Sequence, residues 1–146
     1  ASELALKFGP DLVKRIADTL RNDLNPVMEG FLFEMWFFAL INRDGIRCHG
    51  KDTVYNFEHE NLLRLDPSKK VNCPGVKKAW YKPLNWNQGG YDAVHIDFEK
   101  RVVTFFQINI SKTHSLKLEH MSSLLNKLTF QAQKDGSDRK PKVEIF

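Results

Sequence analysis

Four polar side chains of this sequence have the types and expected positions to perform chemistry. Asp92, Gln107 and Asn109 are expected together at one end of an otherwise apolar surface, where polar groups need partners or a task. Glu34 has mostly apolar helical neighbours, so its carboxylate must be paired, hydrogen-bonded or bound to a cation. Two interpretations of Glu34 stay open: a buried acid satisfied by a backbone group or an arginine, or an acid that points at the same spot as Asp92.

A predicted β-hairpin positions the first three of these residues. Residues 90–97 and 102–110 are rich in β-branched and aromatic side chains, and a polar turn separates them. A turn centred on residues 99–100 pairs residues whose numbers sum to 199, which places Asp92 directly opposite Gln107. Side chains alternate along a strand, so the side chain of Asn109, two residues after Gln107, is expected on the same face as that of Gln107.

Helices are expected on both sides of this hairpin. Asn25 and Pro26 have the types of an N-cap and a first helical residue, and residues 27–41 then form a helix that carries the isolated glutamate. This helix is apolar nearly all round, which predicts a central position. An earlier amphipathic helix, a helix over residues 117–128 and a final strand over residues 142–146 complete the outer elements.

The element order predicts the fold class. Strands are expected at residues 54–57 and 76–81, between the second helix and the hairpin. The order of helix, helix, strands, hairpin, helix and strand predicts an α/β fold with a central mixed sheet flanked by helices. A length of 146 residues predicts a single domain over residues 1–146. The chain opens without Met and stops at Phe146, so we expect it to be part of a longer protein.

Composition excludes several function classes. No apolar run reaches the roughly 18 residues that a membrane-spanning helix needs. Cys48 and Cys73 are too few for a disulfide framework, which favours a reducing compartment. The cysteines and histidines lack the paired spacing of a structural zinc site. A net charge of +4 is compatible with a polyanionic partner.

Basic residues concentrate between residues 64 and 82, where aromatic side chains are interleaved. Such a segment contacts a phosphate backbone and stacks on bases in some proteins, and in others it is a solvated loop anchored by its aromatics. Both interpretations stay open. The lysines of this segment that we expect to contact nucleic acid are Lys69, Lys70, Lys77 and Lys78.

Three short motifs give the chain a family resemblance. They are Gly-Gly-Tyr-Asp92-Ala-Val, Phe-Phe-Gln107-Ile-Asn109-Ile-Ser and Thr-His114-Ser-Leu-Lys117. Together they resemble the PD-(D/E)xK domain shared by Crinkler effectors and the retrotransposon hot spot proteins of trypanosomes. The match covers roughly residues 80–128, and residues 30–41 fit the helix that carries the family's glutamate. The resemblance implies a restriction-endonuclease-like core.

The resemblance also implies a metal-dependent nuclease site. Asp92 would be the main metal ligand, Gln107 would occupy the second ligand position, and the Ile108 carbonyl could complete the site. Glu34 would bind the metal or hold a ligating water. The implied cofactor is Mg²⁺ or Mn²⁺, which orients water and neutralises charge on the phosphate during phosphodiester hydrolysis.

Two amides depart from the pattern of an active nuclease. Gln107 replaces a carboxylate, and Asn109 stands where a lysine would stabilise the transition-state charge. Lys112 or Lys117 is expected to supply a cation from nearby, and His114 is expected either to donate to a phosphate or to cap a helix. Lys112, His114 and Lys117 are therefore added to the expected nucleic-acid contacts.

The sequence leaves two functions open. The first is a DNA-cleaving domain with a degenerate active site. The second is an inactive module on the same fold that binds nucleic acid or protein. The resemblance implies a nuclear location, in a host cell if the protein is an effector. DNA is a more natural partner than RNA, protein partners are compatible, and neither a membrane nor a small-molecule cofactor is expected.

Overall fold

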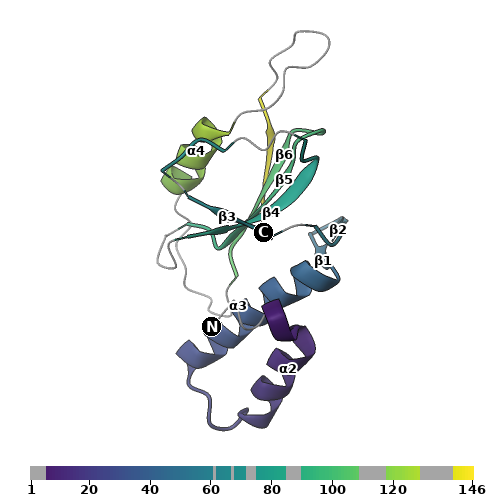
Figure 1. Ribbon diagram of the computed structural model, residues 1–146, viewed down its shortest axis with the longest axis vertical. Coiled ribbons are helices and arrows are strands. Elements are labelled where there is room, and N and C mark those ends of the chain that lie inside the picture. The colour runs from purple at the N-terminus through teal and green to yellow at the C-terminus, as the bar shows by residue number, and fades with distance from the viewer. Residues whose placement is uncertain are drawn as a thin grey trace. The chain divides into compact units, whose positions relative to one another are not determined.

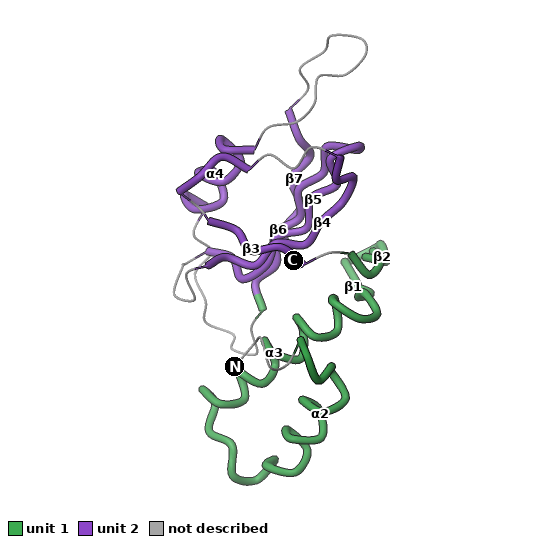
Figure 2. The backbone as a smooth tube through the Cα atoms, viewed as in Figure 1, with its two compact units in different colours: residues 1–60, 108–114 green, residues 61–107, 115–146 purple. Residues whose placement is uncertain are grey.

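The computed structural model describes residues 6–60, 62–66, 68–71, 75–84, 90–108, 118–128 and 140–146. By its internal contacts the chain divides into two compact units, which Figure 2 distinguishes. Unit 1 comprises residues 1–60 and 108–114, and unit 2 comprises residues 61–107 and 115–146. The single domain predicted from the chain length stays a prediction.

The described part of unit 1 contains the helices α2 and α3, a helical stretch at residues 6–8 and a two-stranded sheet. Its elements are α2 (Pro10–Thr19), α3 (Pro26–Arg43), β1 (Ile46–His49) and β2 (Val54–Phe57). The strands β1 and β2 pair in the antiparallel sense. The N-terminus of α3 confirms the predicted cap, because the side chain of Asn25 accepts a hydrogen bond of 2.9 Å from the Met28 amide. Pro26 follows as the first helical residue, where its missing N–H costs nothing.

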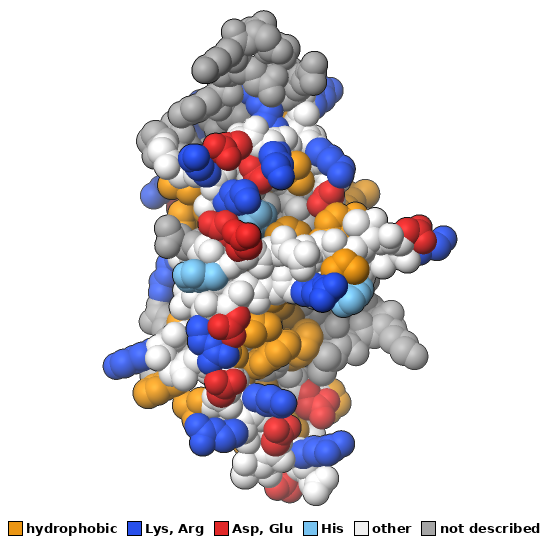
Figure 3. Space-filling model, turned by 90° about the vertical axis from the view of Figure 1, so that its right-hand side faces the viewer, with side chains coloured by type: hydrophobic (Ala, Val, Ile, Leu, Met, Phe, Trp, Pro, Cys, Tyr) orange, Lys and Arg blue, Asp and Glu red, His pale blue; other side chains and the backbone are white. Residues whose placement is uncertain are grey.

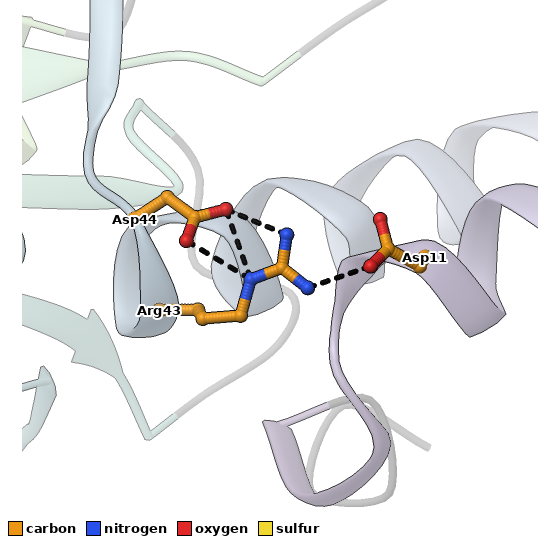
Figure 4. A network of polar contacts seen from close by, with 3 residues as sticks. All are labelled: Asp11, Arg43 and Asp44. Carbon is orange, nitrogen blue, oxygen red and sulfur yellow. Dashed lines mark hydrogen bonds and ion pairs between the residues drawn. The ribbon is translucent and has the colours of Figure 1, made fainter.

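A salt bridge network joins the two helices of unit 1 (Figure 4). Arg43, in the last turn of α3, contacts Asp11, in the first turn of α2, at 2.7 Å and Asp44 at 2.7 Å. The hydrogen bonds that Arg43 donates to Asp44 hold the pKa of the Asp44 carboxyl below its usual range. The side chains of all three residues are well exposed, and exposed ion pairs contribute little to the free energy of folding. The network therefore orients the helix ends more than it stabilises the unit.

The turn from α3 into β1 depends on a glycine. Gly45 has φ of +82°, a conformation that residues with a side chain rarely adopt. A Cβ atom at this position would also overlap the carbonyl oxygen of Phe57. Glycine therefore lets the chain leave the helix and pass close to the end of β2.

The helix α3 is less buried than its composition predicts. Phe38, Ala39 and Ile41 are buried in its second half, whereas Val27 and Phe31 in its first half are 67% and 52% exposed. The helix therefore presents apolar side chains to solvent along its N-terminal turns. The fully buried residues of α3 lie in its C-terminal half, since apolar content by itself does not specify which turns are covered.

Unit 2 is a five-stranded mixed sheet with one described helix (Figure 1). Its elements are β3 (Leu62–Leu65), β4 (Lys78–Pro83), β5 (Ala93–Asp97), β6 (Val102–Phe106), α4 (Leu118–Lys127) and β7 (Lys142–Ile145). The strand order follows the numbering from β3 to β7. The pairs β4–β5 and β5–β6 are antiparallel, and the outer pairs β3–β4 and β6–β7 are parallel. This confirms an α/β fold with a central mixed sheet.

The main core of unit 2 lies between the sheet and α4. Val94 and Ile96 of β5 and Phe105 of β6 are fully buried there, together with Met121 and Leu124 of α4. Alternate residues of a strand share a face, so this side of the hairpin is the apolar surface that the sequence predicted. None of the described helices combines the length and the apolar character that crossing a membrane requires.

Candidate active site at the end of the central hairpin

The central hairpin has the predicted register over its whole strand length. Residue pairs from Ala93↔Phe106 to Asp97↔Val102 all sum to 199, and residues 98–101 form the turn. The strands are shorter than predicted, because β5 begins only at Ala93 and β6 ends at Phe106. Asp92 and Gln107 therefore lie just beyond the paired residues of the two strands, where strand geometry constrains side chains less.

At Asp92 the ladder shifts by one residue. The Asp92 amide donates a hydrogen bond of 2.8 Å to the carbonyl of Phe106, although Ala93 is the register partner of Phe106. Two residues thus oppose one, which is the pattern of a β-bulge. The prediction that Asp92 lies directly opposite Gln107 is therefore wrong by one position. Asp92 still lies near Gln107, because Gln107 directly follows Phe106, the residue to which the Asp92 amide is bonded.

The bulge also changes which residue continues the apolar face. Tyr91 is buried in the same core cluster as Val94 and packs edge-on against Phe105, with ring centroids 5.1 Å apart. Strict alternation from Val94 would have given that place to Asp92. Asp92 instead remains half-buried at the end of the sheet, since the bulge interrupts the alternation. Bulges re-aim side chains in this way beside many active sites.

Gln107 is held between two strands. Its amide donates a hydrogen bond of 2.9 Å to the carbonyl of Phe146, at the end of β7, and its side chain is half-buried. Asp92 lies on one side of Gln107 and the end of β7 on the other. The backbone thus places Asp92 and Gln107, two of the residues that the resemblance implies as metal ligands, as near neighbours at the end of the hairpin.

The remaining predicted residues of the site lie in unit 1 or outside the described parts of the chain. Glu34 is half-buried in α3 and belongs to unit 1, so the expectation that it points at Asp92 stays a prediction. Four predicted residues lie outside the described parts of the chain. These are Asn109, Lys112, His114 and Lys117.

The expected lysine contacts occupy the segment between β3 and β4. Lys69 lies 3.6 Å from Asp66, and Lys77 lies 3.4 Å from Glu99 in the hairpin turn. Lys70 is exposed, and Lys78 is half-buried at the start of β4. Acidic partners therefore reduce the positive field of two of the four lysines. Figure 3 shows the same mixture more widely, with Lys and Arg interspersed among Asp and Glu on the face that it presents.

Two cations that the sequence analysis did not select lie closer to Asp92. The strands β4 and β5 pair Tyr81 with Val94. In the same register Lys82, the next residue of β4, lies opposite Ala93 in the middle of the sheet. Arg64 of β3 is the register partner of Lys82. Neighbouring strands are about 4.8 Å apart, which places both residues on the strands that lead from Asp92 to the sheet edge. Strand order was the missing signal, because β3 was not predicted.

A buried histidine lies on the opposite face of the same hairpin. His95 is 7% exposed, is paired with Thr104 across the strands, and packs against Trp80 with ring centroids 4.9 Å apart. The pKa of His95 is lowered to about 4, mainly by burial; the charge of Asp97 opposes this shift, and the charge of Lys78 adds to it. The imidazole is therefore neutral at physiological pH.

The described residues supply a limited set of donors for a metal. Among them, no three His, Cys, Asp or Glu side chains gather closely enough to hold an ion. Asp92 and Gln107 can contribute one carboxylate and one amide oxygen, and Mg²⁺ accepts such oxygens while keeping several waters. A Mg²⁺ or Mn²⁺ ion at this position would have, among the described residues of unit 2, Asp92 as its charged ligand and Gln107 as a neutral one.

Comparisons with known proteins give this chain no relative. No protein-family model, no curated protein and no solved structure matches it. The geometry of the hairpin end and the motifs of the sequence are therefore the grounds for assigning a function.

Proposed function

We propose that the chain is a PD-(D/E)xK-type nuclease-like domain that hydrolyses DNA phosphodiesters with a bound Mg²⁺ or Mn²⁺. The observation that carries this proposal is the bulge at Asp92, which holds an acidic residue beside Gln107 at the end of the central hairpin. The proposed site has one fewer carboxylate than an active nuclease of this type, and we therefore expect slow turnover.

The order of elements supports a restriction-endonuclease-like core. A helix with a glutamate, α3, precedes the hairpin, and a helix and a further strand, α4 and β7, follow it. The acidic residue directly precedes β5 and the glutamine directly follows β6, which agrees with the order of the family motifs. The mixed sheet is compatible with the same core.

The chemistry assigned to the chain's own residues is limited and specific. A bound divalent cation would polarise the phosphate and lower the pKa of an attacking water. Asp92 would hold that cation by charge and Gln107 by an amide dipole. Lys82 and Arg64 would attract the phosphate backbone toward the hairpin end. A nuclear DNA substrate and an effector setting belong to the same proposal.

We expect Asp92→Ala to reduce metal-dependent cleavage of plasmid DNA by at least about 100-fold, because it removes the single charged ligand of the hairpin end. Gln107→Glu should raise cleavage by about tenfold, since it restores the missing charge beside the metal. The measurement is conversion of supercoiled plasmid with Mg²⁺ or Mn²⁺ in the full chain.

Asp52→Ala is the matched control, because it removes an exposed acid of unit 1 between β1 and β2. It should cleave as the wild type does. Plasmid that stays intact with the wild type and with Gln107→Glu under both metals would refute the nuclease assignment.

A second candidate function is a binding module without catalysis. The amide at Gln107 favours it, because an amide holds a divalent cation less tightly than a carboxylate does. In this case the chain binds nucleic acid, or a protein partner, through exposed side chains of unit 2. In that case the arrangement of Asp92 and Gln107 is retained without catalytic activity.

Neutralising the four lysines tests whether the segment that carries them is the contact surface of such a module. Replacing Lys69, Lys70, Lys77 and Lys78 by glutamine should weaken salt-sensitive DNA binding by about tenfold or more. Asp92→Ala should leave that binding unchanged. Fluorescence anisotropy at several salt concentrations measures both variants. Equal binding by the lysine variant and the wild type would remove this segment as the contact surface.

A further inference from the structure

The strand β7 has one edge bonded to the sheet and one edge turned outward. The Lys142 amide bonds the Arg101 carbonyl and the Phe146 amide bonds the Phe105 carbonyl, both at 2.8 Å. In a parallel pair, the N–H and C=O of a given residue point to the same side. The backbone groups of Val143, between these residues, therefore point away from β6. In the described parts of the chain, no strand pairs with this outer edge.

The outer edge carries exposed apolar side chains. Val143 and Ile145 are 41% and 44% exposed. Their register partners in β6 are Val103 and Phe105, which lie in the apolar core under α4. The apolar face of the sheet thus continues to an edge whose backbone groups are unsatisfied by a neighbouring strand. An edge of this kind is a template for another strand.

The charges on β7 select a second copy of the same strand as its partner. Lys142 and Glu144 share the opposite face and form an ion pair of 2.8 Å. If two copies pair antiparallel about Val143, Lys142 of each copy faces Glu144 of the other. Pairing about Glu144 would instead oppose two like charges, which is destabilising. The sequence around Val143 is therefore self-complementary in one register.

We infer that β7 mediates a two-fold symmetric dimer in which two five-stranded sheets join edge to edge in an antiparallel pair. Val143 faces Val143 across the axis, and the two outward N–H groups donate to the two outward carbonyls. A four-residue strand buries less surface than the roughly 1,200–2,000 Å² of a stable complex. The dimer is therefore weak, with a Kd between about 1 μM and 1 mM.

Charge variants test the register. Lys142→Glu and Glu144→Lys should each place like charges opposite each other twice, and each should raise the dimer Kd by about tenfold or more. An equimolar mixture of the two variants restores opposite charges at both positions. The mixture should form a heterodimer at least as tightly as the wild type dimerises. Sedimentation velocity from about 10 μM to 1 mM measures all three samples.

A proline variant tests the edge without changing charge. Val143→Pro removes an N–H that points outward, so it leaves the bonds to β6 in place and blocks the partner strand. Val143→Thr keeps that N–H and is the control. We expect a monomer for the proline variant and a dimer for the threonine variant, with unchanged circular dichroism in both. A wild type that stays monomeric at about 1 mM, or a charge mixture that stays monomeric, would overturn the inference.

Discussion

Replacement of Phe105 by alanine is expected to lower the free energy of unfolding by about 3–5 kcal/mol, the range for truncating a buried aromatic side chain. Phe105 is fully buried in the centre of β6. It packs against Tyr91 at a ring-centroid distance of 5.1 Å and belongs to the cluster that joins the hairpin to α4. Truncation leaves a cavity that this rigid part of the sheet cannot close. Urea unfolding followed by fluorescence measures the change.

Phe31→Ala provides the control for this experiment. The substitution is the same, but Phe31 is 52% exposed on α3 and loses little buried surface. Its expected cost is about 1 kcal/mol or less. Equal losses at both positions would contradict the assignment of the core to the α4 side of the sheet.

Protonation of His95 alone is expected to lower the free energy of unfolding by about 3 kcal/mol between pH 7 and pH 4. The folded protein keeps this imidazole neutral down to about pH 4, since it is buried, whereas the unfolded chain protonates it near pH 6.5. Lowering the pH through this window therefore favours the unfolded chain. The magnitude follows from about 1.4 kcal/mol for each pKa unit.

His95→Gln tests this linkage by removing the titrating group. The difference in unfolding free energy between wild type and variant should shrink, or change in favour of the variant, as the pH falls from 7 to 4. Comparing differences cancels both the fixed cost of the substitution and the titration of groups that the two proteins share. A constant difference over this range would show that His95 does not govern the acid sensitivity.

The sequence predicts local structure well where a short motif determines it. Asn25 and Pro26 start α3 as expected, and the polar turn after residue 97 sets the hairpin register. The bulge at Asp92 was not predicted. It depends on whether Tyr91 or Asp92 enters the core, and burial of the larger aromatic side chain decides that choice.

The pattern of residue types along the chain does not predict which strands that are distant in the sequence pair with each other. Nothing in the sequence places β7 beside β6, although this pairing holds Gln107 in position. The strand β3 was missed because its leucine-rich sequence lacks β-branched residues. The candidate site was therefore predicted without the cations of adjacent strands, Lys82 and Arg64, which became visible only with the strand order.

The pairing of β6 with β7 also has a kinetic consequence. Residues such as Thr104 and Glu144, which face each other across this pair, are 40 positions apart in the chain. The helices α2 and α3 of unit 1, in contrast, are joined by a short turn, and closing a short loop costs less entropy. Contacts between sequence-distant strands form slowly. The helical pair is thus expected to assemble first during refolding, and the backbone bond that positions Gln107 to be among the last formed.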